Sequence, residues 1–381
     1  MIYVITFLLS CTVFLLSEKS HSKYLKRILV IVAILLPCFL AAIRHNTIGT
    51  DVKVYVEPLY NAARESDNFA TFMQQRWFVV WRYMYVNQFE IGFSTMIFLI
   101  EKLGGSLKTV LFFIQLLIIT PVYLGLKKIN KPYPIYFGMC VFYFIFYNTS
   151  LNMMRQWIAM SILFLGFSYL VADEKKRYFV YIVVGTLFHT SALFGVIIFV
   201  IYQFCQKQRI SIRVNNFKLK EEIIPIKFFI YGCVALLSLN VIVVLLDKIG
   251  LGKYVNYIQG SSSIYILPGQ IFIRLPIIVL FVIRWKRMLR EDKLMPFYGV
   301  MIVLDLLSSQ LQSVNPYAFR IGSFFAEYNM LIYPAIVYTG NSKYRANRYL
   351  TLICVLAYII FYWTYYYVVL GTHATVPYMF A

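Results

Sequence analysis

The residues of this chain that could do chemistry begin with a lone arginine at the start of an apolar run. The stretch 152–161, NMMRQWIAMS, contains Arg155 and no acidic residue. On a helix, Asn152, Arg155 and Gln156 would share one face at spacings of three and four, and Ala159 would follow on the same face. An arginine inside a bilayer costs about 2.5–3.5 kcal/mol on insertion scales and usually faces a bundle interior or a wet cavity. The stretch therefore predicts a binding face, with snorkelling of Arg155 to the lipid headgroups as the alternative.

Three other arginines repeat this pattern of a single cation at the end of an apolar segment. They are Arg44 in AAIRHN, Arg274 in IFIRLPIIV and Arg320 in NPYAFRIGSFF. Each arginine taken alone could snorkel to the headgroups. Guanidinium groups bind phosphate oxygens through paired hydrogen bonds and never lose their charge in proteins. Together with Arg155, these arginines predict a site for a dianionic group.

Two carboxylates and one histidine are candidates for proton transfer. Asp51 follows Gly49 in RHNTIGTDVKVY, residues 44–55, where a tight turn could present the carboxylate or an ion pair could stabilise the loop. Glu90 in FEIGF opens an apolar segment, where a carboxylate could also simply favour a helix N-terminus. His189 in LFHTSAL lies between two apolar halves and could exchange protons, donate to a phosphate oxygen or be structural.

Composition places the chain in a membrane. Of its 381 residues, 61% are hydrophobic and 14% are charged, and the mean hydropathy is +0.71. A soluble domain of this length could not bury so much apolar surface. The net charge of +20 is divided among short clusters between apolar segments, which argues against a nucleic-acid surface and fits the positive-inside rule. We therefore expect an all-α, polytopic integral membrane helical bundle with no nucleic-acid partner.

Motifs for metals, cofactors and several enzyme classes are missing from the sequence. The six cysteines show no CxxC pairing and the four histidines show no ligand spacing, so we expect no disulfide framework, metal site or cofactor. The chain also has no Walker loop, no GxSxG elbow and no DxD pair after its first apolar segment. These observations argue against nucleotide hydrolysis, serine-hydrolase chemistry and metal-dependent transfer from a sugar nucleotide.

The basic clusters also orient the chain. Of the 36 lysines and arginines, 24 lie in six connections between apolar segments, and we place these connections in the cytoplasm. About twelve spans result if 91–103 is a short partial segment that does not cross. The same count requires 178–188 and 190–204 to be two short helices that meet near His189 at the outer face.

This orientation predicts one transmembrane domain over 1–381. Within it, 44–90 is a long extracytoplasmic loop and 203–227 is a basic cytoplasmic loop. Most of the unusual polar residues named above lie on or beside the outer connections. The economical hypothesis is a site of chemistry that faces away from the cytoplasm.

At these positions the chain resembles the EpsG/Wzy family of bacterial polysaccharide polymerases. The resemblance covers about residues 40–200, and the last third matches mainly in hydropathy and in Arg320. It rests on four short motifs in order: RHNTIGTDVKVY with its arginine, glycine, aspartate and tyrosine at 44, 49, 51 and 55; EIGF from Glu90; NMMRQWIA from Asn152; and FHTSAL from Phe188.

The resemblance implies a GT-C-like glycosyltransferase in the bacterial cytoplasmic membrane that needs neither metal nor nucleotide. A growing glycan on undecaprenyl pyrophosphate would pass to the sugar end of another lipid-linked repeat unit at the outer face. The product would be an O-antigen, capsule or exopolysaccharide. Its partners would be lipid-linked oligosaccharide repeat units and bilayer lipids, with a chain-length regulator protein as a further candidate.

Roles for the individual residues follow from this reaction. A leaving pyrophosphate needs fixed positive charge, and the candidates are Arg155, Arg320, Arg44 and, fourth, Arg274. The acceptor hydroxyl needs a general base within hydrogen-bond reach, and the candidates are Asp51, Glu90 and neutral His189. The candidates for binding sugar or phosphate oxygens are Asn152, Gln156 and Tyr55.

Three other functions would use a similar set of residues. A transporter or flippase of lipid-linked saccharides would also need an arginine-lined cavity, but transporters often show internal repeats that this sequence lacks. A ligase of the O-antigen type would differ only in its acceptor. A membrane O-acyltransferase would use His189, although no Ser-His arrangement accompanies it.

Overall fold

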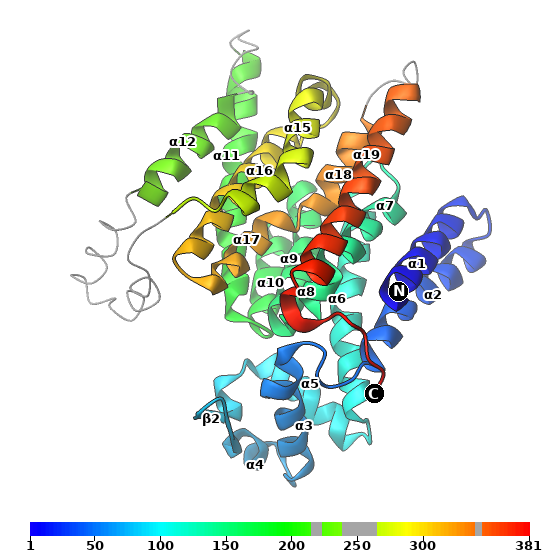
Figure 1. Ribbon diagram of the computed structural model, residues 1–381, viewed down its shortest axis with the longest axis vertical. Helices are drawn as coiled ribbons and strands as arrows, with labels where there is room; N and C mark the ends of the chain where they lie inside the picture. The colour runs from blue at the N-terminus through cyan, green and yellow to red at the C-terminus, as the bar shows by residue number, and fades with distance from the viewer. Residues whose placement is uncertain (215–222, 238–264, 340–344) are drawn as a thin grey trace. The chain divides into compact units, whose positions relative to one another are not determined.

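The computed structural model describes residues 1–214, 223–237, 265–339 and 345–381, and most of these residues are helical (Figure 1). The chain divides into two compact units. The first unit comprises Met1–Val196 and Ile359–Ala381, and the second comprises Ile197–Tyr358. The chain therefore leaves the first unit within α11, Phe194–Val214, and returns to it within α19, Arg345–Trp363.

Helices long and apolar enough to cross a membrane occur in both units. The described residues contain seven: Ile2–Lys19, Lys23–Ala42, Leu107–Ile129, Met154–Val171, Thr190–Lys207, Pro268–Glu291 and Asn347–Val369. Shorter apolar helices cover Ile135–Ser150, Ile224–Val234 and Asn329–Tyr338. A stretch of about 20 apolar residues is the length that spans the hydrocarbon core. These helices confirm the expected class, a helical membrane protein.

The helical part of the first unit is built around α9. Its helices are α1 Ile2–Lys19, α2 Lys23–Ala42, α6 Leu107–Ile129, α7 Ile135–Val141, α8 Tyr147–Ser150, α9 Met154–Val171 and α10 Lys175–Thr186. Helix α9 packs against α6 and α10, and α1 packs against α2. A Cβ at Gly125 of α6 would lie 2.7 Å from Cδ1 of Phe164 of α9, so this glycine permits the close approach. Most of α9 is buried, and Arg155 stands in its first turn.

The first unit contains three π-helical segments, at Val52–Val56, Phe142–Phe146 and Thr364–Val369. A π-helical turn leaves carbonyl groups without their usual partners in the helix. In the second of these segments the carbonyl of Ile145 accepts a hydrogen bond of 2.5 Å from the hydroxyl of Tyr367, which belongs to the third. The second and third π-helical segments are therefore joined through a buried side chain.

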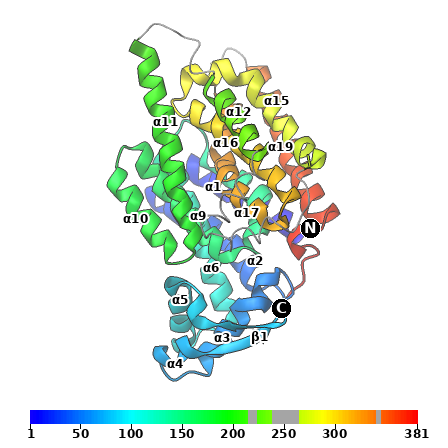
Figure 2. The same ribbon diagram turned by 90° about the vertical axis from the view of Figure 1, so that its left-hand side faces the viewer.

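The long predicted loop 44–90 is folded. It contains α3 Glu57–Arg64, α4 Phe69–Gln74, β1 Arg76–Val79, β2 Arg82–Tyr85 and a 3-10 turn at Val86–Gln88, and α5 Ile91–Lys102 follows it. Figure 1 shows α3, α4, α5 and β2 gathered in one group, and Figure 2 shows the same group with β1. Helix α5 has 12 residues, which is the short helix expected for 91–103.

The hairpin formed by β1 and β2 is a small β element in a chain whose described residues are otherwise mostly helical, as expected. The strands pair antiparallel, with Arg76 opposite Tyr85 and Val79 opposite Arg82. Val80 and Trp81 form the two-residue turn and both have positive φ, at 47° and 62°. Positive φ at both central positions gives the twist that a two-residue hairpin needs. The stretch RWFVVWRYMY is rich in aromatic residues and valine, which favour strand, and the sequence analysis did not use this signal.

The second unit contains α12 Ile223–Leu237, α15 Pro268–Glu291, α16 Met295–Gln310, α17 Phe319–Ala326 and α18 Asn329–Tyr338, together with most of α11 and α19. Short 3-10 turns at Leu311–Ser313 and Pro316–Ala318 join α16 to α17. Helix α11 continues to Val214 and α12 begins at Ile223, so the predicted basic loop 203–227 is helical over 203–214 and 223–227. Its residues 215–222 lie outside the described part of the chain, as do 238–246 of the predicted apolar segment 228–246.

Candidate active site

Four segments that are distant in the sequence meet in one polar cluster of the first unit. They are the turn before the Val52–Val56 segment, the start of α5, the turn before α9 and the turn between α10 and α11. The C-terminal segment after α19 joins them. All members except Tyr55 are at least partly exposed, so a ligand can reach them. The polar cluster comprises Thr50, Asp51, Tyr55, Glu90, Asn152, Arg155, His189 and His373.

Arg155 is paired with a carboxylate 65 positions away in the chain. Its Nη1 donates to Oε2 of Glu90 at 2.5 Å, and the two side chains are 21% and 12% exposed. The guanidinium carbon lies 4.9 Å from the ring centre of Tyr55 and 4.7 Å from that of Phe89. The Nε of Arg155 is buried and has no hydrogen-bond partner. The cation is thus held in one orientation and keeps at least one unused donor.

Glu90 ties α5 to the turn that follows α10. Its Oε1 accepts a hydrogen bond of 3.1 Å from the backbone N–H of Thr190, while Oε2 is used by Arg155. The backbone N–H of Gly92 also donates to the carbonyl of Leu187 at 2.8 Å. A Cβ at Gly92 would lie 2.7 Å from that carbonyl oxygen, which explains the glycine of EIGF. Both oxygens of the Glu90 carboxylate therefore have partners.

His189 caps the 3-10 turn Thr190–Leu193. The backbone N–H of Ser191 donates to its Nδ1 at 3.1 Å, and the hydroxyl of Ser191 lies 2.6 Å from the same nitrogen. A ring nitrogen that accepts a backbone N–H carries no proton, so a neutral imidazole has its proton on Nε2. In this arrangement Nε2 is a donor. Nδ1 of His189 is thus occupied within its own turn.

The turn that presents Asp51 is fixed against the start of α9. Gly49 has φ of +79°, and a Cβ there would lie 2.4 Å from the carbonyl oxygen of Leu151. The hydroxyl of Thr50 donates to Oδ1 of Asn152 at 2.7 Å, and the backbone N–H of Asp51 donates to the same oxygen at 3.4 Å. The residues Gly49, Thr50 and Asp51 of the first motif therefore dock on the third motif.

Tyr55 lies between the negative and positive members of the polar cluster. Its hydroxyl donates a short hydrogen bond to Oδ2 of Asp51, and its ring lies under Arg155. Burial raises the pKa of Tyr55 well above its usual value, and the charge of Asp51 raises it further against the opposing effect of Arg155. Tyr55 is therefore a neutral hydrogen-bond donor.

Asn152 precedes α9, so the predicted helical face that joins it to Arg155 and Gln156 is wrong. Helix α9 begins at Met154, and Met153 has a non-helical conformation with φ of −102° and ψ of 53°. The Asn152 side chain accepts from Thr50 and reaches Nδ1 of His373 at 3.2 Å through its amide nitrogen. These tertiary hydrogen bonds compete with helix formation at Asn152. Gln156 is buried and its Nε2 lies 3.8 Å from the sulfur of Met160.

The side chain of Arg44 is buried next to the turn before α9 and is not one of the exposed groups of the polar cluster. The side chain is 2% exposed, and Nη2 donates to the carbonyl of Leu151 at 3.3 Å. Burial lowers the pKa of Arg44, partly offset by the nearby tyrosines and Asp51. Within the described residues Arg44 forms no ion pair, and its Nε is buried without a hydrogen-bond partner. Its backbone pairs with Phe380 in an isolated β-bridge, which ties down the C-terminal segment.

His373 is the one histidine of the polar cluster that sequence reasoning did not select. It has positive φ, 67°, in the turn that follows α19. The segment around it is fixed to the first unit by Tyr3, whose hydroxyl donates to the carbonyl of Thr375 at 2.9 Å, and by Asn148, whose Nδ2 donates to Oγ1 of Thr375 at 3.0 Å. No local pattern marks a histidine in GTHATVP as part of a site, because its partner Asn152 lies more than 200 positions away.

Arg274 and Arg320 belong to the second unit. Arg274 forms a paired ion contact with Asp305, with Nε at 2.9 Å from Oδ2 and Nη2 at 3.0 Å from Oδ1. Its Nη1 donates to the carbonyl oxygen and to Oε1 of Gln270. Arg320 is exposed, and its guanidinium lies 5.4 Å from the ring centre of Tyr317. Sequence reasoning did not select Asp305, which lies inside an apolar segment 31 positions from its partner.

A polar hollow of about 310 Å³ lies in the folded region between residues 53 and 79. Its lining includes Lys53, Asn61, Glu65, Gln75, Arg76 and Trp77. The indole N–H of Trp77 donates to the carbonyl of Val54 at 3.1 Å. The indole stacks on Phe89 with ring centres 5.6 Å apart, and Phe89 in turn contacts Arg155. The polar hollow is therefore linked to the polar cluster by aromatic contacts.

The polar cluster can hold an anion and move a proton. Arg155 supplies a fixed positive charge, Asp51 a carboxylate, and Tyr55 and His189 hydrogen-bond donors. Among the residues that the structure describes, no three histidine, cysteine, aspartate or glutamate side chains are grouped so as to hold a metal ion. These groups suit a reaction in which an acceptor hydroxyl loses its proton and attacks a carbon that bears a phosphate leaving group.

Comparison with known proteins assigns a family to nearly the whole chain. The model of the EpsG family matches residues 27–380. The match includes the C-terminal segment with His373, which the four short motifs did not reach. Neither the curated proteins nor the solved structures give a match.

Proposed function

Because the chain belongs to the EpsG family of polysaccharide polymerases, we propose that it joins lipid-linked oligosaccharide repeat units into a surface polysaccharide. The observation that supports this proposal is the polar cluster, in which all four motifs of the family resemblance meet around the Arg155–Glu90 ion pair. The donor in this proposal is a growing glycan on undecaprenyl pyrophosphate. The acceptor is the sugar end of a second lipid-linked repeat unit.

In the proposed reaction Arg155 binds the pyrophosphate of the donor. Glu90 uses Nη1 of the guanidinium and orients it, and the side chain is still 21% exposed, so its exposed N–H groups can donate to phosphate oxygens. Negative charge grows on the pyrophosphate as its bond to the anomeric carbon breaks. A cation fixed before the reaction stabilises that charge without reorganisation.

Asp51 is the general base of the proposal. Glu90 is committed to Arg155 and Thr190, and Nδ1 of His189 is committed to the backbone of Ser191. Asp51 lies on an accessible turn and receives the proton of the acceptor hydroxyl as that oxygen bonds to the anomeric carbon. The pyrophosphate lipid leaves with the electron pair of the broken bond. Tyr55 donates to Asp51 and orients its carboxylate, and His189 donates to a ligand oxygen.

Arg44, Asn152 and Gln156 have supporting roles in this proposal. Arg44 binds the turn before α9, and Asn152 joins that turn to the turn of Asp51. Gln156 is buried and contacts Met160 of the same helix. Arg274 and Arg320 remain candidate phosphate ligands of the second unit, with Arg274 already paired to Asp305.

The saccharide of one substrate occupies the polar hollow in this proposal. Sugar rings present apolar faces and hydroxyl edges, and a hollow with one indole and several charged or amide side chains matches both. The stacking of Trp77 on Phe89 would place that sugar beside Arg155.

The proposed setting is the bacterial cytoplasmic membrane, with the polar cluster at its outer face. We infer that the chain crosses the membrane about twelve times, that α5 enters the membrane without crossing it, and that the arrangement is GT-C-like. Basic linkers on the opposite side support this orientation. A chain-length regulator protein is the proposed partner in controlling polymer size.

The test is the surface glycan of a strain that depends on this chain. Arg155→Ala and Arg155→Lys should both replace long polymers by single repeat units, because alanine removes the cation and lysine lacks the rigid planar fork that can pair with Glu90 and a phosphate together. The matched control is Arg177→Ala, since Arg177 is 65% exposed and lies outside the polar cluster. Normal polymer length in both Arg155 variants, at normal protein levels, would remove Arg155 from the reaction.

Reconstitution with defined lipid-linked repeat units separates polymerisation from its alternatives. Polymer ladders support the proposal. Translocation of the substrates without new glycosidic bonds would indicate a flippase, and transfer only to a lipid core acceptor would indicate a ligase.

A further inference from the structure

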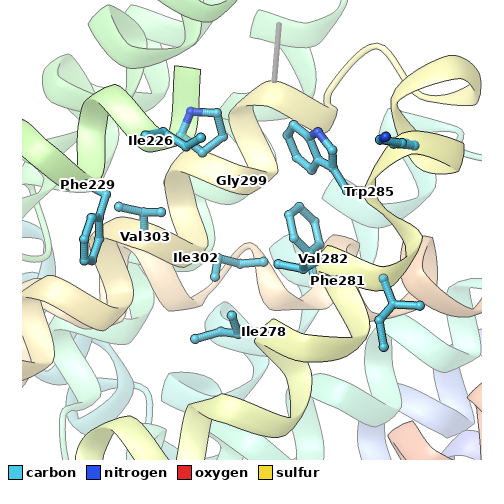
Figure 3. Close-up of a pocket in the computed structure, with 12 residues that line it drawn as sticks. Ile226, Phe229, Ile278, Phe281, Val282, Trp285, Gly299, Ile302 and Val303 are labelled. Carbon is cyan, nitrogen blue, oxygen red and sulfur yellow. The ribbon is translucent and has the colours of Figure 1, made fainter. Parts of the chain in front are cut away.

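An apolar groove of about 620 Å³ crosses the surface of the second unit. Figure 3 shows its labelled side chains, with Ile226 and Phe229 of α12 on one side and Phe281 and Trp285 of α15 on the other. Helix α16 forms the floor and packs against both α12 and α15. Gly299 of α16 lets Pro225 and Trp285 pack closely on that helix, since a Cβ there would lie 2.6 Å from Pro225 and 3.0 Å from Trp285.

The rim of this groove is apolar and exposed. Ile226, Phe229 and Val282 are 56%, 43% and 64% exposed, and all three line the groove. Helix α15 is long and apolar enough to span the membrane, and only 17% of its most apolar stretch is buried by protein. In a membrane-spanning chain, an apolar hollow on such a helix faces hydrocarbon. A flexible acyl chain fits a narrow hydrophobic groove of this kind.

One end of the groove carries positive charge. The last turns of α15 read RWKRMLRE, and Trp285 and Lys286 both line the groove. Arg284 is engaged by the hydroxyl of Thr351 at 2.9 Å and by the carbonyl of Thr339 at 3.0 Å. Lys286 and Arg290 are exposed and form no ion pair with any described residue. A tryptophan beside exposed cations is typical of the level of lipid headgroups.

We propose that this groove binds one anionic phospholipid, with an acyl chain lying between Phe229 and Val282 and the phosphate at Lys286. The occupant is anionic because the end of the groove offers cations without carboxylate partners among the described residues. It belongs to the cytoplasmic leaflet because the positive-inside rule places the basic connection 284–293 there. This inference does not depend on the proposed polymerase reaction.

Trp285 provides the readout, because bromine atoms on a lipid chain quench an indole that they touch. The full-length protein is reconstituted in bilayers that contain brominated phosphatidylglycerol or brominated phosphatidylcholine, each diluted in unlabelled phosphatidylcholine. The contribution of Trp285 is obtained by subtracting the fluorescence of Trp285→Phe from that of the wild type. We expect half-maximal quenching of this difference at about fivefold less phosphatidylglycerol than phosphatidylcholine, the preference that one interfacial lysine provides.

Lys286→Gln tests the headgroup contact. It should reduce the preference for phosphatidylglycerol toward onefold, while Lys176→Gln, an exposed lysine of α10 in the first unit, should leave it unchanged. Equal quenching by the two lipids in the wild type would overturn the proposal, as would a preference that survives Lys286→Gln. If unlabelled undecaprenyl phosphate releases the quenching at a lower concentration than unlabelled phosphatidylglycerol does, the occupant of the groove is a polyprenyl lipid, and the proposal is overturned. If neither lipid quenches Trp285 and the protein is a dimer, a second copy of the chain covers the groove, and the proposal is overturned.

Discussion

Replacing Glu90 by glutamine keeps the shape of its side chain and removes the charge that faces Arg155. At an effective dielectric constant of about 20, two unit charges about 4 Å apart attract by roughly 4 kcal/mol. The side chains are 21% and 12% exposed, and the glutamine oxygen still accepts a hydrogen bond, so only part of this attraction is lost. We expect Glu90→Gln to lower the free energy of unfolding by about 2 kcal/mol, within the range for a hydrogen bond to a charged group.

The assay is a denaturant titration of the purified protein in mixed micelles, combined with a double-mutant cycle. Glu90→Gln, Arg155→Gln and the double variant should give a coupling energy of about 1–2 kcal/mol. Glu174→Gln is the matched control, because its partners Arg177 and Lys128 are 65% and 34% exposed and the loss there should stay below about 0.5 kcal/mol. Additivity of the two cluster substitutions within about 0.3 kcal/mol would refute the reasoning that the pair acts as a unit.

Three further predictions concern the residues around this pair. Gly49→Ala should abolish polymer formation and destabilise the protein by about 1–3 kcal/mol, because a Cβ would lie 2.4 Å from the Leu151 oxygen at a φ of +79°; wild-type thermal stability would contradict this. Trp77→Ala should shorten the polymer and raise the substrate concentration needed for half-maximal rate, whereas Trp81→Ala at the exposed hairpin tip should not; equal effects would remove the polar hollow from the sugar site. Because the pKa of Tyr55 is raised above its usual value of about 10, Tyr55→Phe should lower the rate without changing the shape of the rate profile between about pH 7 and pH 9, and a changed profile would show that the phenol titrates there.

Much of the polar cluster was predictable from residue type alone. A carboxylate, an arginine or a histidine within an apolar sequence is costly, so the sequence marks each such residue as a candidate for function. Six candidates of the sequence analysis lie in the polar cluster: Asp51, Tyr55, Glu90, Asn152, Arg155 and His189.

Their partners could not be predicted in the same way. The sequence shows no acid near Arg155, yet Glu90 contacts it from the start of another helix. The start of α9 was misplaced because local periodicity extends the helix back to Asn152, while hydrogen bonds to Thr50 and His373 hold Asn152 outside it. These errors have one cause: the decisive contacts join segments that no local pattern relates.

The sequence by itself determined that this chain is a helical membrane protein with a few costly polar residues, because burial of apolar surface and insertion of charge depend on composition along the chain. Only the tertiary structure decided that Arg44 is buried, that Arg155 is paired with Glu90 and that His373 completes the polar cluster. Each of these outcomes depends on which side chains lie within a few ångströms of one another, and packing of the whole first unit sets those distances.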